Sequence, residues 1–440
     1  MIETNQTNSR DCAKGKVIVA TTAPINIFDP DVLVNPYEAY RQLRDGPALH
    51  HVPEMNVHVA TRYDIVREII RDTEVFSSEY TVFFEQLRAV GIASATPEVR
   101  AELERLEQQI IPPVPTMLTL DEPGHTRYRS LVSALFTVKE TRKSEAAVNQ
   151  VVEETIASLG DAGAIEFMEA YAAPIPLRVI GQRLGIPEED VAMFNRGATA
   201  AASGLRLTPL TGDQMIERAQ TAVDLQNLLV RLIEERRSHP TEDMISILAN
   251  SRLEDENRLL NHGEILSILG QFLVAGHETT TSAFGWAMLL LCRNPEIEKN
   301  IASDPKMLAT FIEESLRLEA PVQGLPRLVT RDTAVEDYKL KAGDIVFLRY
   351  GSANRDDRKF EDADQCDLQR KKAGAHFAFG AGVHACIGAP LSRQELQLGW
   401  TALLRHGKNF RLAPGKPEPQ AEMSFILRNL PELHVEFDLR

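Results

Sequence analysis

The segment His376-Phe-Ala-Phe-Gly-Ala-Gly-Val-His-Ala-Cys-Ile-Gly388 carries the most unusual combination of residues in the chain, and a helical pattern follows it over residues 390–404. The glycines around Cys386 predict a tight loop whose backbone amides turn toward the sulfur. The following helix directs its positive N-terminal end at the same atom. Both effects favour a thiolate, which acts as a nucleophile or as a metal ligand.

Several interpretations of Cys386 stay open on this segment alone. A structural cysteine in a turn is the simplest one. A zinc site with His376 and His384 lacks a second ligand pair at the usual spacing, and a cysteine nucleophile lacks an assigned histidine base. The glycines also fit a dinucleotide-binding pattern, but no βαβ unit surrounds them. The remaining interpretation is a haem-iron thiolate, which needs one cysteine as its only protein ligand.

A second unusual segment lies within the longest predicted helix, residues 263–292. This helix is apolar nearly all round, which is typical of a helix buried on every side, and at 1.5 Å per residue it is about 45 Å long. Its centre breaks the pattern, because Gly276, Glu278, Thr279 and Thr280 place a glycine and polar groups in the core. Buried polar groups are paired or functional. The same residues also fit a kinked core helix whose glutamate forms a salt bridge.

Helical patterns dominate the rest of the chain, and strand-like alternation is limited to short pieces. A βαβ alternation is absent, which argues against a doubly wound sheet. We therefore predict a mainly α fold with small β-sheets, in which residues 25–440 form a single domain after an N-terminal tail, residues 1–24. The predicted helices occupy residues 36–44, 63–71, 137–159 and 221–237, and the predicted strands occupy residues 57–61, 328–331, 338–340, 345–350 and 434–437.

The composition limits the class of protein. A chain of 440 residues with 43% hydrophobic and 25% charged residues is typical of a globular protein. Its net charge of −15 argues against a general binder of nucleic acid or anionic membranes. Four scattered cysteines indicate a reducing compartment, and the polar N-terminus contains no signal-like apolar run. We therefore expect a cytoplasmic protein without a membrane anchor.

Three ordered motifs together resemble those of the cytochrome P450 family of haem-thiolate monooxygenases. Phe379 to Gly388 fits the cysteine-loop signature F-G-x-G-x-H-x-C-x-G at every fixed position. Ala275 to Thr280 matches the central-helix motif of the family, and Glu314 to Arg317 matches its E-x-x-R motif. Residues 121–129 and 353–356 also resemble segments of soluble bacterial members. The resemblance extends from about residue 25 to the end, and it implies a haem between the long central helix and the cysteine loop.

The resemblance implies haem b as the cofactor and Cys386 as its axial metal ligand, whose thiolate donates electron density to the iron. Phe379 would cover the sulfur, while Gly380 and Gly388 would let the backbone approach it. The other implied haem contacts are Ala275 on the central helix and, for the two propionates, His125, Arg129, Arg327 and His384. Arginine suits this task because its planar fork binds carboxylates.

Glu278 and Thr279 match the acid and the alcohol that the family uses for catalysis. In this role, a hydroxyl holds water beside the reacting oxygen and a carboxylate relays protons from solvent. Glu314 and Arg317 are implied to hold their helix to the segment before the cysteine loop. Arg370 is an expected third partner, in a segment where Cys366 stands in place of the usual phenylalanine.

The implied reaction is a hydroxylation, which inserts one atom of dioxygen into an apolar small organic molecule. The segments that contact substrate in the family predict a pocket lined by Gln271, Val274, Val322, Leu325 and Phe425, most of which are apolar. Residues 77–117 are expected to add further contacts, and residues 190–220 are expected to form a lid.

The chain carries no flavin, nicotinamide or iron–sulfur motif, so we expect NAD(P)H electrons to arrive through a separate ferredoxin and ferredoxin reductase. Basic residues predicted on the cysteine side of the haem would form a docking face for an acidic ferredoxin. They are Arg127, Arg129, Lys139, Arg142, Lys143, Lys371 and Lys372. We expect a monomer with no nucleic-acid or membrane partner. A haem sensor or carrier is the alternative from another class, and a cysteine or zinc hydrolase is a third possibility.

Overall fold

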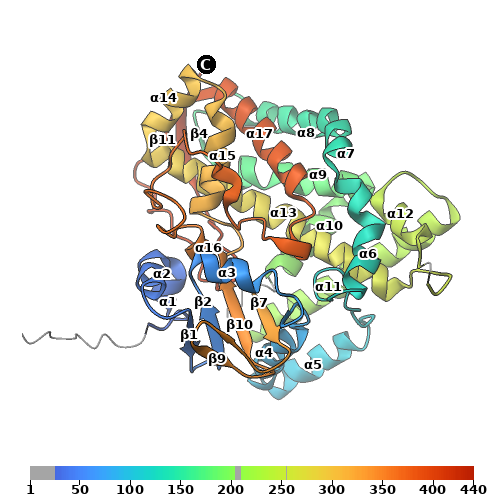
Figure 1. The fold of residues 1–440 in the computed structure, drawn as a ribbon. Coiled ribbons are helices and arrows are strands. Elements are labelled where there is room, and N and C mark those ends of the chain that lie inside the picture. Colours follow the sequence, from blue (N-terminus) through green and yellow to red (C-terminus); the bar gives the residue numbers. More distant parts are fainter. Residues whose placement is uncertain (1–24, 204–209, 254) are drawn as a thin grey trace, which may run out of the picture.

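The computed structural model describes residues 25–203, 210–253 and 255–440. The predicted tail, residues 1–24, and positions 204–209 of the predicted lid lie outside the described residues. The described chain is mainly helical with small sheets, which confirms the predicted fold class. Figure 1 shows the helices filling the upper part of the molecule, with most of the strands gathered below them.

The helices account for most of the predicted periodic segments. They are α1 (Pro30–Val34), α2 (Tyr37–Arg44), α3 (Tyr63–Ile69), α4 (Thr81–Ala93), α5 (Pro97–Glu107), α6 (Gly124–Ser133), α7 (Val138–Lys143), α8 (Glu145–Leu159), α9 (Pro174–Leu184), α10 (Val191–Ser203), α11 (Gly212–Ser238), α12 (Met244–Asn250), α13 (His262–Arg293), α14 (Pro295–Ser303), α15 (Met307–Leu318), α16 (Tyr350–Ala353) and α17 (Ala389–His406). Short 3₁₀ or π turns cover residues 134–136, 168–172, 188–190, 373–375 and 382–384.

The strands form small sheets at the edge of the helical part. They are β1 (Leu49–Val52), β2 (Val57–Ala60), β3 (Phe76–Ser77), β4 (Ala164–Glu166), β5 (Arg252–Leu253), β6 (Arg258–Leu259), β7 (Gly324–Val329), β8 (Thr333–Val335), β9 (Tyr338–Leu340), β10 (Ile345–Arg349), β11 (Gly407–Leu412) and β12 (His434–Leu439). The largest sheet has the order β1-β2-β10-β7-β3, and a second has the order β11-β12-β4. β10 runs parallel to β2 and antiparallel to β7, with Leu348 opposite Leu325.

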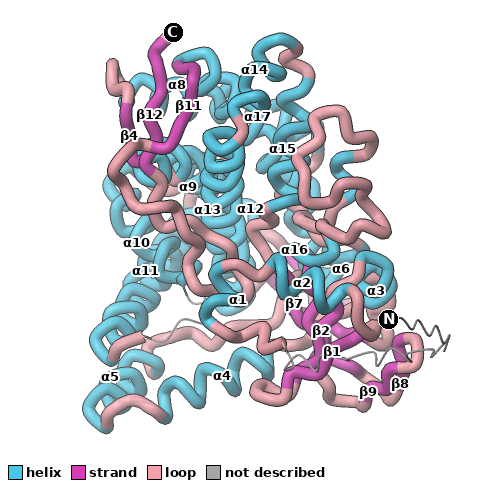
Figure 2. The backbone as a smooth tube through the Cα atoms, turned by 90° about the vertical axis from the view of Figure 1, so that its left-hand side faces the viewer, coloured by secondary structure: helices cyan, strands magenta, loops and turns pink. Residues whose placement is uncertain are grey.

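Helix α13 is the 32-residue helix that the apolar pattern predicts, and it runs through the middle of the helical part (Figure 2). Its start is fixed by a capping box, in which the side chains of Asn261 and Glu264 accept hydrogen bonds from each other's backbone amides. It packs against α9, α10, α15 and α17. In the part of the chain that the structure describes, no helix has the length and apolar character that crossing a bilayer requires.

Two predicted elements have different boundaries in the structure. The helix predicted over residues 137–159 is divided at Ser144, whose hydroxyl donates to the carbonyl oxygen of Thr141 and so competes with the helix ladder. The strand predicted over residues 328–331 is β7, which begins earlier because its pairing with β10 starts at Gly324. Pro326 and Arg327 hide the alternation of this strand in the sequence.

Candidate active site

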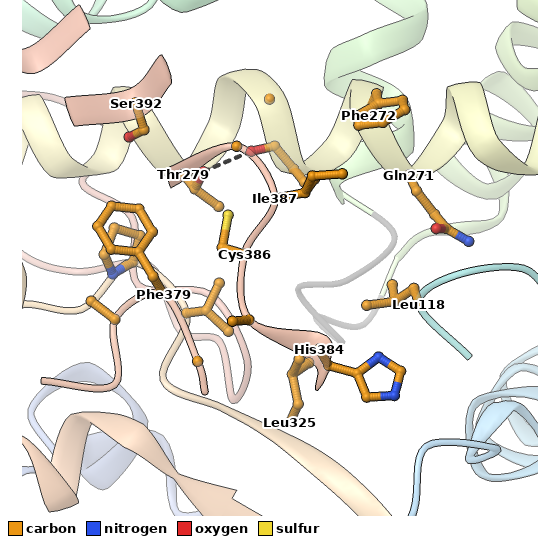
Figure 3. A pocket seen from close by; sticks show the side chains of 18 of the residues that line it. Leu118, Gln271, Phe272, Thr279, Leu325, Phe379, His384, Cys386, Ile387 and Ser392 are labelled. Atoms are coloured by element: carbon orange, nitrogen blue, oxygen red, sulfur yellow. Dashed lines mark hydrogen bonds between the residues drawn. The ribbon is translucent and has the colours of Figure 1, made fainter. Parts of the chain in front are cut away.

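The cysteine loop, residues 376–388, closes on itself beneath α13. The Cys386 amide donates to the Phe379 carbonyl oxygen at 2.8 Å, and this bond turns the chain back on itself. Gly380 and Gly382 have φ angles of 63° and 70°, a left-handed conformation that favours glycine. A Cβ on Gly382 would also lie 3.1 Å from the carbonyl oxygen of Ile70. The loop therefore presents the sulfur of Cys386 to a cavity, opposite Thr279 of α13 (Figure 3).

Burial and the groups around Cys386 act in opposite directions on the pKa of its thiol. Burial raises the pKa of the Cys386 thiol, and the backbone amides of Gly388 and Ala389 with the charges of Arg129 and Arg393 lower it without reversing the shift. The loop amides at the N-terminus of α17 therefore act in the predicted direction, against the effect of burial. A metal ion bound to the sulfur would favour the thiolate further, because a coordinating thiol is deprotonated outright.

A zinc or hydrolase site at Cys386 would need further polar groups close to the sulfur. Among the described residues, no group of three or more His, Cys, Asp or Glu side chains lies close enough to hold a metal ion. His376, a candidate zinc ligand in the sequence, has its Nε2 atom 3.2 Å from the carboxylate of Glu313. Arg393 forms a second ion pair with Glu313 and places its guanidinium 4.4 Å from the centre of the Phe379 ring.

The arginine and histidine side chains at one edge of the cavity allow a test of whether haem fits. Arg129, Arg327 and His384 line the cavity, and the His125 ring lies 4.5 Å from the His384 ring. Burial, followed by the charges of Arg327, His125 and Arg129, lowers the pKa of His384 to about 4. The buried Nε2 atoms of both histidines and Nε of Arg327 have no hydrogen-bond partner in the structure. Unpaired buried nitrogen atoms beside two guanidinium groups suit an anionic partner, and the two propionates of haem would provide one.

The predicted catalytic pair takes up two different positions on α13. Thr279 lines the cavity, and its hydroxyl donates to the carbonyl oxygen of Ala275 at 2.8 Å. Glu278 is not among the lining residues; its carboxylate accepts a hydrogen bond from Asn429 at 2.5 Å, and one oxygen lies 3.6 Å from Nε2 of His277. Gly276 lets α9 approach, because a Cβ there would lie 3.2 Å from Ile180.

The E-x-x-R pair forms the centre of a buried ionic network. Arg317 donates two hydrogen bonds to Glu314, at 2.7 and 2.9 Å, and both side chains are 0% exposed. Further donors of Arg317 reach the carbonyl oxygens of Asn354 and Gln365. Arg370 lies 3.0 Å from Glu314. Burial alone raises the pKa of Glu314, but its partners, Arg317 first, hold it below its usual range.

The cavity lining agrees only in part with the predicted substrate pocket. Three of the predicted substrate-pocket residues line the cavity: Gln271, Val322 and Leu325. The other predicted site residues that line it are Arg129, Ala275, Thr279, Arg327, Phe379, Gly380, His384, Cys386 and Gly388. Val274 and Phe425 are absent from the lining, contrary to our expectation. Phe425 instead stacks on Phe28 at 4.3 Å and meets Phe347 of β10 edge-on, so its ring belongs to the core beside the sheet.

Several lining residues were not predicted. Phe272 of α13 and Leu118, which lies in a short loop segment without a motif, are two of them. Tyr80 and Met117 also line the cavity and lie within residues 77–117, which were expected to add contacts.

Glu395 of α17 also lines the cavity, and burial raises its pKa to about 8, with Arg183 acting in the opposite direction. The sequence around Glu395 does not predict this burial. Glu395 lies on an amphipathic helix, and the sequence does not show which other elements cover that side of the helix.

Some of the basic residues predicted as a docking face are paired, and Lys143 is both paired and exposed. Arg127 forms an ion pair with Glu256, Lys143 pairs with Glu140 at 2.7 Å, and Arg129 donates to the carbonyl oxygen of Ala385. The exposed members of the set are Lys139, Arg142, Lys143, Lys371 and Lys372. The positive character of this face therefore depends on fewer residues than the sequence suggested.

Comparison with known proteins places this site in a family. The family model for Cytochrome P450 matches residues 205–436. Nocardicin C N-oxygenase of Nocardia uniformis subsp. tsuyamanensis is 32% identical over 93% of this chain and 97% of its own. Vitamin D(3) 25-hydroxylase of Pseudonocardia autotrophica is 30% identical over 93% of this chain and 96% of its own. The structure of cytochrome P450 CYP109Q5 from Chondromyces apiculatus is 28% identical with a TM-score of 0.80, covering 95% of this chain and 99% of that one.

The fold, the cysteine loop and these similarities define an oxidoreductase of the monooxygenase class. The chain belongs to the cytochrome P450 family and is of its bacterial type. Membership implies a haem with a cysteine thiolate as its ligand, and it implies small-molecule substrates.

Proposed function

We propose that this protein hydroxylates an apolar small organic molecule, inserting one atom of dioxygen with NAD(P)H electrons that a ferredoxin and its reductase deliver. One observation carries the proposal: the sulfur of Cys386 and the hydroxyl of Thr279 face the same mainly apolar cavity. We also propose that residues 25–440 act as one domain, that the protein is cytoplasmic, which its composition favours, and that it is a monomer.

Haem b, when bound, supplies the redox chemistry that activates dioxygen. Cys386 would hold it as the axial ligand, and His125, Arg129, Arg327 and His384 would hold its propionates. The donor set supports these roles because it combines one sulfur with a cluster of buried cationic or unpaired nitrogen atoms.

The other site residues of the chain manage protons and water. The hydroxyl of Thr279 donates to Ala275, so its lone pairs remain able to accept a hydrogen bond from water in the cavity. Glu278 precedes Thr279 on the same helix, and its carboxylate would relay protons between solvent and the water that Thr279 holds. Phe272, Leu325 and Val322 exclude bulk water from the same space.

The apolar lining supports a hydrophobic substrate. Vitamin D(3) 25-hydroxylase, to which this chain is similar, is named for the hydroxylation of a largely apolar molecule. The exposed Lys139, Arg142, Lys371 and Lys372 support a docking face for an acidic ferredoxin.

Reconstitution with a ferredoxin, its reductase and NAD(P)H tests the proposed function. A panel of terpenes, steroids, fatty acids and aromatic compounds is first screened for a shift of the haem spin state. With a compound that gives this shift, we expect a hydroxylated product that contains one oxygen atom from ¹⁸O₂. Haem-loaded protein that binds such a compound but yields no labelled product with any ferredoxin tested would contradict the proposal.

Thr279→Ala tests the role of the hydroxyl. We expect this variant to keep haem and substrate binding while most NAD(P)H electrons go to hydrogen peroxide, because the water that Thr279 holds is lost. The measurement is the ratio of product to NAD(P)H consumed. Thr281→Ala is the matched control, since that hydroxyl faces Ala172 and does not line the cavity. An unchanged ratio in Thr279→Ala would argue against the proton relay.

A further inference from the structure

The carboxylate of Glu278 is bound by a residue from the far end of the chain. Nδ2 of Asn429 donates to Oε1 of Glu278 at 2.5 Å, and the two residues are 151 positions apart. Glu278 is 9% exposed and Asn429 is 6% exposed, so the hydrogen bond is largely shielded from solvent. A shielded hydrogen bond to a carboxylate is directional and strong.

Asn429 is itself held in place at both ends. Its side-chain oxygen accepts a hydrogen bond from the Ser282 hydroxyl, one helical turn after Glu278 on the same helix. Its backbone carbonyl accepts from the Glu422 amide at 2.9 Å. The amide group of Asn429 is therefore clamped along α13 between Glu278 and Ser282. Because both of its ends are fixed, it has little freedom to rotate away from the carboxylate.

The residue before Asn429 anchors the same segment to the cavity wall. The Arg428 amide donates to the carbonyl oxygen of Pro321 at 2.8 Å, and its carbonyl oxygen accepts from Nε1 of Trp286 at 2.8 Å. Pro321 and the adjacent Val322 both line the cavity. The segment that binds Glu278 is thus tied both to α13 and to the wall that would contact substrate.

We propose that Asn429 is a positioning residue for the proton-relay acid, fixing the Glu278 carboxylate behind Thr279. This inference rests on the proposed function, in which Glu278 and Thr279 move protons to the cavity. Thr279 lines the cavity and Glu278 does not, so the orientation of the carboxylate decides whether it can reach water held by the hydroxyl. Among the described residues, His277 on the same helix is a titratable group beside it, with Nε2 3.6 Å from the carboxylate.

Asn429→Asp gives the sharpest test, because it replaces the donor with a second carboxylate facing Glu278. Two like charges in one site keep a proton to higher pH. We therefore expect the pH profile of product formation to shift upward by about one pH unit. The infrared spectrum of the resting protein at neutral pH should gain a protonated carboxyl band. That band should disappear in the double variant Glu278→Gln/Asn429→Asp, since the two sites are coupled.

Asn429→Ala tests the same inference without adding a charge. With the carboxylate no longer oriented, we expect kcat to fall about tenfold and the solvent deuterium isotope effect to rise, with KM unchanged. Asn294→Asp is the matched control, since it makes the same change at the C-terminal end of α13, where the side chain bonds only a helix carbonyl. It should leave the pH profile and the infrared spectrum unchanged.

The outcomes separate this inference from the proposed function. If Thr279→Ala and Glu278→Gln divert electrons to peroxide while folded Asn429→Asp and Asn429→Ala behave as wild type, Asn429 has no positioning role. If neither Thr279→Ala nor Glu278→Gln changes the coupling, the proton relay itself is wrong. A shifted pH profile in Asn429→Asp that persists after Glu278→Gln would also overturn the inference, because the effect would then not pass through Glu278.

Discussion

Replacement of Cys386 by alanine is expected to abolish the far-red Soret band of thiolate-ligated ferrous haem with carbon monoxide, and to reduce turnover to background. The physical reason is that Cys386 is the one cysteine among the described residues that line the cavity. Its loss would therefore leave the iron without a sulfur ligand. The measurement is an absorption spectrum of the purified protein after reduction with dithionite and exposure to carbon monoxide.

Cys366→Ala is the matched control for this prediction. Cys366 packs against the helical core, and burial raises the pKa of its thiol to about 12, so it stays protonated and outside the site. We expect the control to keep the wild-type spectrum. A thiolate spectrum retained by Cys386→Ala would remove the ligand assignment. A wild-type protein without haem absorption after haem-replete expression would contradict the proposed function. Cys386 would then be interpreted again as a nucleophile or a zinc ligand.

Replacement of Glu314 by alanine is expected to lower the free energy of unfolding by about 3–5 kcal/mol. This substitution leaves Arg317 and Arg370 facing each other in the interior without the carboxylate that compensates them. Removing one partner of a fully buried ion pair leaves the other charge buried without compensation. The resulting loss of stability is larger than the net stabilisation that the intact pair provides. The measurement is urea unfolding of the haem-loaded protein, followed by circular dichroism and by the Soret band.

The chain contains a matched control with the same spacing. Glu38 and Arg41 of α2 also form an E-x-x-R pair at 2.7 Å, but both side chains are more than half exposed to solvent. We expect Glu38→Ala to leave the unfolding midpoint unchanged, because water and salt screen an exposed pair. Equal effects of the two substitutions would show that burial does not decide the role of the motif.

The sequence predicted the elements whose signals are local. The apolar pattern located α13 to within one residue at each end, because a helix buried on all sides has apolar residues on all of its faces. The glycines around Cys386 predicted a tight loop because a left-handed backbone favours glycine. Boundaries set by pairing with a distant strand, as in β7, were predicted less well.

The site itself could be predicted only where a motif spans a few residues. Phe425 was expected in the pocket from its place in the chain, yet its ring packs between Phe28 and Phe347. The sequence of α17 does not distinguish Glu395 from an exposed acid on an amphipathic helix. Glu395 is buried only because other elements cover that face of the helix. Neither outcome follows from helical or strand periodicity. Periodicity shows which face of an element is apolar, but not which other element packs against that face.

By itself, the sequence determined the class of fold, the family and the identity of the cysteine that faces the cavity, because these depend on short segments with strong conformational preferences. Only the tertiary structure decided that the Glu314–Arg317 pair is buried while the Glu38–Arg41 pair is exposed, and which residue holds the carboxylate of Glu278. The physical reason is that burial and long-range hydrogen bonds arise from the packing of elements far apart in the chain. The energy of a charge or a polar group depends on that packing and not on its sequence neighbours.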